Sequence, residues 1–131
     1  MTELNELMQG DDWKTEKHVP VMDIEGKAAK GQPIKVNVGV GKEVSHPNTT
    51  QHHIKWISLF FLPEGEKIPY QLGDIVFAAH GSSVEGADTS TIYTDHQGSF
   101  VFSTEKDGTL LASSYCNIHG LWENSKQIKL N

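Results

Sequence analysis

Short apolar segments with a period of two, separated by turn-forming residues, dominate the sequence and leave little choice of fold class. The clearest segment is residues 34–40, in which every second residue is Ile or Val. A period of two is typical of a half-buried β-strand, whereas no window of helical length has a 3.6-residue period. We therefore expect an all-β protein.

Strands are expected at residues 19–24, 34–40, 54–62, 74–80, 100–103, 109–115 and 126–130, with a further short one at 91–94. Residues 54–62 are apolar at both parities, which predicts a central strand with both faces covered. Asp107-Gly108 predicts a hairpin turn between the strands at 100–103 and 109–115. About seven short strands in one small domain are typical of an immunoglobulin-like β-sandwich or barrel.

The 131 residues predict a single domain. We expect residues 1–12 to form a flexible N-terminal arm, because Gly10-Asp11-Asp12 interrupts its short apolar pattern, and residues 13–131 to form the β-domain. The N-terminus is acidic and lacks the basic and apolar regions of a signal peptide, so we expect a cytoplasmic protein. No apolar run approaches the roughly 20 residues of a membrane span, so no membrane partner is expected.

Composition excludes several classes of protein. The net charge is −6 and there is no arginine, which argues against nucleic acid as a partner. The single cysteine excludes an intrachain disulfide and any metal module built on several cysteines.

That single cysteine is nevertheless the strongest chemical signal, because a histidine follows it three residues later. Cys116 and His119 would lie on one tight turn, where a thiolate and an imidazole can share a transition metal. A lone cysteine at the end of an apolar strand is more often a small buried hydrophobic residue, so the motif alone leaves both readings open.

Further histidines could complete a metal site. His46 and His52 share one turn-rich loop, and we favour His52 over His53 because adjacent residues of an extended segment point to opposite faces. His18 follows Glu16 and Lys17, which are either working residues beside a metal or ordinary surface charges. His80 and His96 have no partner pattern, and we interpret them as structural or exposed.

Two longer runs are specific enough to indicate a family. They are His-Pro-Asn-Thr-Thr-x-His-His at 46–53 and Ser-Tyr-Cys-Asn-Ile-His-Gly-Leu-Trp-Glu-Asn at 114–124. Together with Asp-Trp-Lys at 12–14, Glu-Lys-His-Val-Pro at 16–20 and Phe-Leu-Pro-Glu-Gly at 61–65, they resemble the superoxide reductase family. That family is also called neelaredoxin or the iron-binding domain of desulfoferrodoxin.

The resemblance implies a function and a complete set of site residues. It implies one-electron reduction of superoxide to hydrogen peroxide at one mononuclear non-haem iron per chain, which cycles between Fe2+ and Fe3+. It gives Glu16 the role of a flexible carboxylate and Lys17 that of a cationic residue. Because this chain lacks the four-cysteine domain of longer members, it resembles the one-iron class, which implies a homotetramer and a rubredoxin-like electron donor. The implied metal ligands are His18, His46, His52, Cys116 and His119.

Three alternatives remain at this point. A cupredoxin-like electron carrier also combines one cysteine with imidazoles on a β-sandwich, but it usually adds an axial methionine, and none follows His119. A non-catalytic binding module could use the same fold. A bifunctional site with some dismutase activity is compatible with the same residues.

Overall fold

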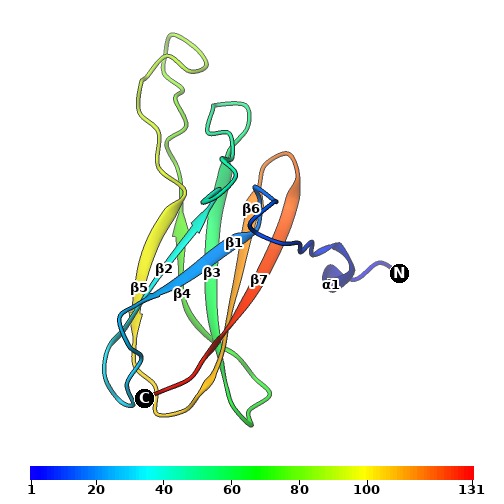
Figure 1. Cartoon of the computed structure of the whole chain (residues 1–131). Helices are drawn as coiled ribbons and strands as arrows, with labels where there is room; N and C mark the ends of the chain where they lie inside the picture. Colours follow the sequence, from blue (N-terminus) through cyan, green and yellow to red (C-terminus); the bar gives the residue numbers. More distant parts are fainter.

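The computed structural model describes all 131 residues and contains one short helix and seven strands (Figure 1). The elements are α1 Leu4–Leu7, β1 Pro20–Glu25, β2 Ile34–Val40, β3 Ile54–Pro63, β4 Tyr70–Val76, β5 Gln97–Phe102, β6 Gly108–Cys116 and β7 Gly120–Ile128. The expected all-β class and strand number are confirmed.

The strands form two antiparallel sheets that face each other. One sheet has the order β1-β2-β5 and the other the order β4-β3-β6-β7. This is an immunoglobulin-like sandwich in which the fourth strand pairs with β3 and not with β5. Strand β3 is central in its sheet, as expected, because it pairs with both β4 and β6.

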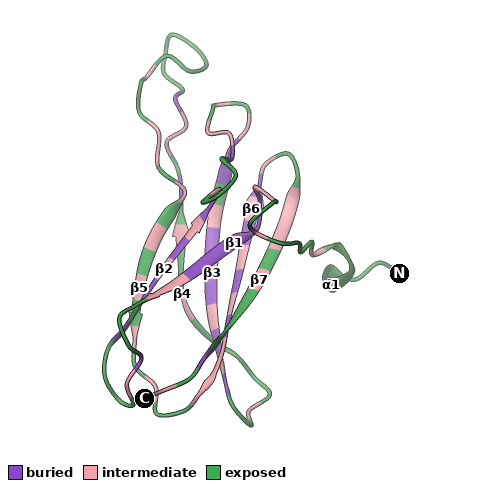
Figure 2. Ribbon diagram, viewed as in Figure 1, coloured by how far each residue is buried: buried purple, intermediate pink, exposed green.

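The core lies between the two sheets, and the alternation in the sequence places it there. Every second residue of β2 is buried, and β3 and β6 also turn one face inward (Figure 2). The outer face of β3 is only half-buried, so the prediction that both its faces are covered is wrong. The outer side chains of β3 have no second layer of protein above them, since the sandwich has only two sheets.

Two strands lie elsewhere than the sequence predicts. Strand β4 is Tyr70–Val76, whereas residues 74–80 were expected, because its register is set by pairing with β3 after the turn at 63–66. Phe77 is buried in the core although it lies beyond the end of that strand. Strand β7 begins at Gly120, six residues before the predicted strand at 126–130, because its pairing with β6 continues from the turn that joins them.

The predicted hairpin at Asp107-Gly108 is wrong. The strands on either side, β5 and β6, belong to different sheets, so residues 103–107 cross from one sheet to the other. Strand β6 instead forms a hairpin with β7, through the turn Asn117–His119. Residues 91–94 are not a strand and contribute only an isolated bridge between Tyr93 and His80.

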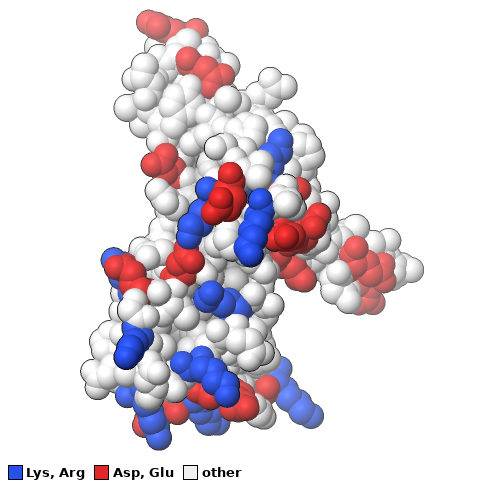
Figure 3. Space-filling model, in the orientation of Figure 1, with Lys and Arg blue, Asp and Glu red and all other residues white.

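Three segments come together at one end of the sandwich. They are the β6–β7 turn, the connection from β2 to β3 (residues 41–53) and the segment that leads into β1, while the long connection from β4 to β5 projects beyond them (Figure 1). In Figure 3, acidic side chains occur on the projecting connection and on the N-terminal arm, and lysines gather at the opposite end of the molecule.

The N-terminal segment is attached to β7 at one residue. Gln9 forms a parallel bridge with Trp122, with main-chain hydrogen bonds to Leu121 and Glu123. The side chains of Leu4 and Leu7 in α1 are exposed. The flexibility of residues 1–12 stays a prediction.

Candidate metal centre

Four potential metal ligands from distant parts of the chain meet at this end of the sandwich. The ligand atoms of His18, His52, Cys116 and His119 all lie within 4.8 Å of one another. Cys116 is fully buried and not in a disulfide, while His119 is exposed. The set therefore has an inner thiol and an outer edge that faces solvent.

The β6–β7 hairpin positions Cys116 and His119. Its three-residue turn ends at Gly120, whose φ of +85° lies in the left-handed region that such turns need and that glycine adopts without strain. The turn folds back so that the His119 main-chain N–H donates to Cys116 Sγ at 3.4 Å. The turn therefore holds the sulfur of Cys116 against the main chain of His119.

His46 and His52 lie on the connection from β2 to β3, and Asn117 of the hairpin holds that connection in place. Asn117 Oδ1 accepts from the main-chain N–H of His53 at 2.9 Å, and Asn117 Nδ2 donates to the carbonyl of Gln51 at 2.8 Å. Asn117, the residue that follows the cysteine of the motif, thus joins the two ligand-bearing segments.

His18 enters from the segment before β1 and is held on several sides. Its main-chain carbonyl accepts from the Ser114 hydroxyl at 3.1 Å, and its ring stacks on Trp122 with centroids 4.7 Å apart. Its Nδ1 is 2.8 Å from Glu16 Oε1, and Glu16 also accepts from the His18 main-chain N–H. A carboxylate on Nδ1 leaves Nε2 to face the other ligands.

The four imidazoles close a nearly square ring. Going around His18, His46, His52 and His119, neighbouring centroids are 4.8, 4.8, 5.0 and 4.8 Å apart. The distance across the ring, from His18 to His52, is 6.5 Å, close to the diagonal of a square with such sides. The ring of His46 thus lies beside those of His18 and His52. Its nitrogens do not belong to the group of ligand atoms that lie within 4.8 Å of one another.

The free nitrogen lone pairs fit a metal. Nε2 of His46 and Nε2 of His52 are both buried without a hydrogen-bond partner. In His46 the other nitrogen, Nδ1, donates to the Pro47 carbonyl at 2.6 Å. Because a neutral imidazole carries one proton, Nε2 of His46 is then unprotonated. Buried polar atoms normally have partners, so two such orphans in one cluster indicate a ligand. His18 Nε2 and His119 Nδ1 are 3.1 Å apart, the spacing of two nitrogens bound at right angles to one ion by bonds of about 2.1 Å.

Burial keeps three of these imidazoles, His18, His46 and His52, neutral, as metal binding requires. Burial lowers the pKa of His46 to about 3, and neighbouring histidines contribute. Burial also lowers the pKa of His18 and His52, in spite of the Glu16 carboxylate beside His18. A neutral imidazole with one nitrogen committed elsewhere is ready to bind a cation with the other.

Lys17 lies beside the centre without a carboxylate partner. Its side chain is half-buried, and its positive charge lowers the pKa of both His18 and His52. The four ion pairs of the structure involve Lys35, Lys42, Lys106 and His18, and none involves Lys17. Its charge is therefore free to act on an anion at the centre.

The other histidines lie outside the ring. His53 stacks on His80 with centroids 3.5 Å apart, and its Nδ1 donates to the Thr49 carbonyl at 2.9 Å. His96 approaches only His46, at 5.9 Å between centroids. The structure brings together all the histidines that the sequence singled out, and it leaves His53, His80 and His96 apart.

Sequence reasoning missed three supporting residues: Asn117, Trp122 and Gln9. The first two lie within the run 114–124, so their position in that motif could have drawn attention to them. Gln9 Nε2 donates to the His119 carbonyl at 2.8 Å, and nothing in its sequence surroundings indicates this contact.

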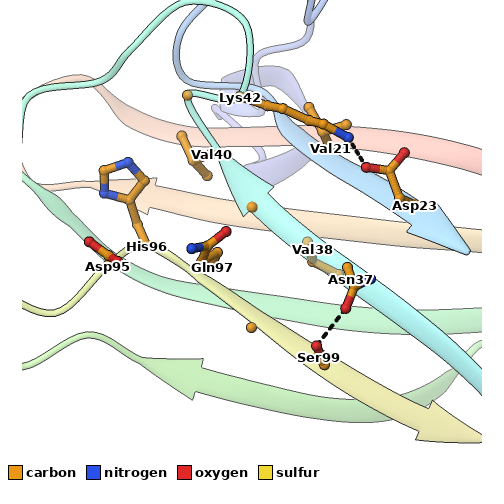
Figure 4. Close-up of a pocket in the computed structure, with 13 residues that line it drawn as sticks. Val21, Asp23, Asn37, Val38, Val40, Lys42, Asp95, His96, Gln97 and Ser99 are labelled. Atoms are coloured by element: carbon orange, nitrogen blue, oxygen red, sulfur yellow. Dashed lines mark hydrogen bonds and ion pairs between the residues drawn. The ribbon is translucent and has the colours of Figure 1, made fainter. Parts of the chain in front are cut away.

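The largest hollow of the surface is elsewhere, on the outer face of the three-stranded sheet (Figure 4). Figure 4 shows Lys42 paired with Asp23 and Asn37 bonded to Ser99 along this hollow. Apart from this one ion pair the hollow is lined mainly by uncharged residues, and it holds no cluster of metal ligands.

The donor set defines a class of protein, a mononuclear metalloprotein on an immunoglobulin-like sandwich. Four imidazoles lie beside the thiol, whereas a cupredoxin site uses only two histidines. No helix of the structure is long and apolar enough to cross a membrane.

Comparisons with known proteins agree with this class. The desulfoferrodoxin family model matches residues 10–125. A superoxide reductase of Pyrococcus furiosus is 55% identical over 92% of this chain and 95% of the relative. Neelaredoxin of Megalodesulfovibrio gigas is 46% identical over 95% of this chain and 96% of the relative. The structure of the reduced superoxide reductase (neelaredoxin) of Archaeoglobus fulgidus, 55% identical, has a TM-score of 0.89 over 95% of this chain and 99% of that chain.

The chain therefore belongs to the desulfoferrodoxin family, and the resemblance drawn from the two sequence runs is confirmed.

Proposed function

We infer that this chain is a superoxide reductase that reduces superoxide to hydrogen peroxide at a mononuclear iron centre. The observation that carries this inference is the ring of four imidazoles beside a buried thiol, in a chain 55% identical to a protein named superoxide reductase. The reaction consumes one electron and two protons for each superoxide, so the enzyme needs an external electron donor.

The proposed ligands are the imidazoles of His18, His46, His52 and His119 and the thiolate of Cys116, which hold one iron per chain. The orphaned nitrogens of His46 and His52 support this set, and His53 is excluded by its stack with His80. When bound, the iron supplies the single electron by passing from Fe2+ to Fe3+, a change that an anionic thiolate ligand favours.

Lys17 is proposed to attract superoxide and to stabilise negative charge at the centre. Its support is the unpaired positive charge beside His18 and His52 in a protein whose net charge is −6. A local cation can raise the encounter rate of a small anion even where the whole molecule repels it.

Glu16 is proposed to act in two positions. Bonded to His18 Nδ1, as in this structure, its carboxylate orients the ring and makes it a stronger ligand. The resemblance gives it a second position at the oxidised metal, where a carboxylate would promote loss of the product. Moving to that position requires Glu16 to release His18.

The electron donor is proposed to be a small rubredoxin-like protein. We propose that it docks at the β6–β7 turn, because electron transport requires the donor to come close to the metal centre. Ile118, at the tip of that turn, is 52% exposed next to His119. A homotetramer is also proposed, with the exposed leucines of α1 as one available contact surface. A cytoplasmic location is also proposed, because the single cysteine is a free thiol and free thiols suit a reducing compartment.

The proposed function is tested by iron content, visible spectrum and product yield together. We expect one iron per chain, a thiolate-to-Fe3+ charge-transfer band in the oxidised protein, and peroxide formed from superoxide without matching dioxygen. Equal yields of peroxide and dioxygen would instead indicate dismutation at the same site. Protein without iron after loading would reject the proposal.

A further inference from the structure

The connection that carries His46 and His52 is held from outside by the long connection between β4 and β5. Thr50 lies between the two histidines in the sequence and bonds to Asp88 twice. The Thr50 main-chain N–H donates to Asp88 Oδ1 at 2.9 Å, and the Asp88 main-chain N–H donates to Thr50 Oγ1 at 3.0 Å. The Thr50 hydroxyl then donates to the His80 carbonyl at 2.6 Å.

Asp88 adopts an unfavourable backbone conformation to make these bonds. Its φ is +54°, in the left-handed region, where most residues with a Cβ are strained and Asp is among the better tolerated. The Tyr93 hydroxyl donates to the same oxygen at 3.0 Å. These donors lower the pKa of Asp88, so the carboxylate stays ionised and keeps both hydrogen bonds.

The connection that carries Asp88 is itself folded tightly, so it can act as a support. The carbonyl of Gly81 accepts from the main-chain N–H groups of Thr89 and Ser90 at 2.8 and 2.9 Å. Gly81 has a φ of +86° and packs directly on Tyr93, whose ring atoms would be 2.5 Å from a Cβ at that position. A second link to the metal loop runs from Asn48 Nδ2 to the Thr94 carbonyl at 3.0 Å.

We propose that Asp88 is a positioning residue of the metal centre, which fixes the loop 46–52 through Thr50 so that His46 and His52 face Cys116. The inference rests on the proposed function, since it assigns a support to the ligands named there. The loop has no regular secondary structure of its own, and its ligand atoms are therefore placed by side-chain bonds such as these. Residues that orient metal ligands from outside commonly change metal affinity by 10- to 100-fold when they are removed.

Three variants separate this role from simple loss of stability. D88G removes the acceptor but relieves the strain of φ +54°, so the fold is kept. D88N keeps an acceptor oxygen and a residue type that tolerates this conformation. E85A is the matched control, because Glu85 is an exposed acid on the same connection and its carboxylate makes no hydrogen bond.

The first measurement is the rate at which the iron-loaded protein loses iron to an excess of a coloured chelator, well below its melting temperature. We expect D88G to release iron about tenfold faster than wild type, and D88N and E85A to match wild type. The second measurement is hydrogen exchange of the Thr50 and His52 amides in the metal-free protein. These amides should exchange faster in D88G alone, while the amides of β2 remain unchanged.

Equal iron release and equal exchange in D88G and E85A would overturn the proposal. Faster release accompanied by faster exchange throughout β2 would also overturn it, because the effect would then be general unfolding. Wild-type protein that takes up no iron would reject the proposed function instead, and hydrogen exchange would still decide whether Asp88 fixes the loop.

Discussion

Cys116 combines complete burial with a position beside the imidazole ring, where its Sγ lies within 4.8 Å of the ligand atoms of His18, His52 and His119. C116S changes one ligand atom at nearly constant volume, so the sandwich should fold as before. Because a neutral hydroxyl is a far weaker ligand for iron than a thiolate, we expect loss of the charge-transfer band and of most bound iron. Visible spectra and iron content of the two proteins check this, with circular dichroism as the control for folding. An unchanged colour would show that the band does not come from Cys116.

His46 makes the stability of the metal-free protein depend on pH. Its pKa is lowered to about 3 in the folded state, mainly by burial, against an ordinary value of 6.5. Between these values the unfolded chain binds a proton that the folded chain does not. The free energy of unfolding should therefore fall as pH drops from 6.5 to about 3, by up to about 1.4 kcal/mol per pH unit for this group.

The test compares urea unfolding of metal-free wild type and H46Q across this range. Glutamine does not titrate, so the variant should have a shallower dependence on pH. His18 and His52, whose pKa values are also lowered, remain in both proteins and account for the residual slope. Identical slopes would mean that burial does not keep His46 neutral.

At the scale of elements, the β6–β7 turn depends on the backbone of Gly120. G120A places a Cβ at a φ of +85°, where it would meet only Gln9 Nε2 at 3.7 Å. The variant should therefore lose stability through backbone strain and not through a steric clash. We expect a loss of about 1–2 kcal/mol in stability and a shifted charge-transfer band, because the turn carries both Cys116 and His119. Urea unfolding and the visible spectrum check the two parts.

G26A is the matched control for this prediction. Gly26 also has a positive φ, +68°, and a Cβ there would meet nothing within 4 Å, at the end of β1 away from the ligands. It should lose similar stability and keep the wild-type spectrum. A spectrum altered equally in both variants would show that the turn has no special effect on the centre.

Strands with a strong internal pattern could be predicted from the sequence, and strands defined by their partners could not. Strand β2 lies where its alternating Ile and Val residues place it, at Ile34–Val40. Strand β7 is an edge strand whose residues are mostly exposed or half-exposed, so it has no apolar period to detect. Asp107-Gly108 has the composition of a hairpin turn, but a local sequence does not tell whether the next strand stays in the same sheet.

In the candidate site, too, the features carried by local motifs could be predicted and those that depend on distant partners could not. The grouping of His18, His52, Cys116 and His119 could be predicted because whole motifs resemble those of a known family. The parity argument that favoured His52 over His53 agrees with the structure, although its assumption of an extended segment does not hold, since residues 51 and 52 form a bend before β3. Supports such as Asp88 act through hydrogen bonds between distant loops, and sequence spacing does not reveal these.

At the scale of the whole molecule, the acidic charge opposes an anionic substrate and Lys17 counters it locally. The net charge is −6, and K17A makes it −7, since −6 − 1 = −7. If the local lysine dominates, added salt should slow the wild-type reaction by screening the attraction. K17A should be about tenfold slower at low salt and should no longer be slowed by salt.

Pulse radiolysis or stopped-flow at several ionic strengths measures these rates. K42A is the control, because it removes the same charge from a lysine that is already paired with Asp23 on the outer face of the sheet. The iron spectrum should be unchanged in both variants. If K17A and K42A react at the same rate, Lys17 has no role in the reaction.

The ring of ligands also has a consequence for folding. His18 and His119 are 101 positions apart in the chain, yet their ring nitrogens are 3.1 Å apart. An ion held by both would be a cross-link that closes most of the folded chain into a loop. Closing a loop of this length in the unfolded chain costs about 5 kcal/mol of entropy, so the unfolded chain would not hold the ion, and binding by the native state alone would add to its stability. Loss of the metal should therefore lower the stability of the whole sandwich as well as remove the reaction centre.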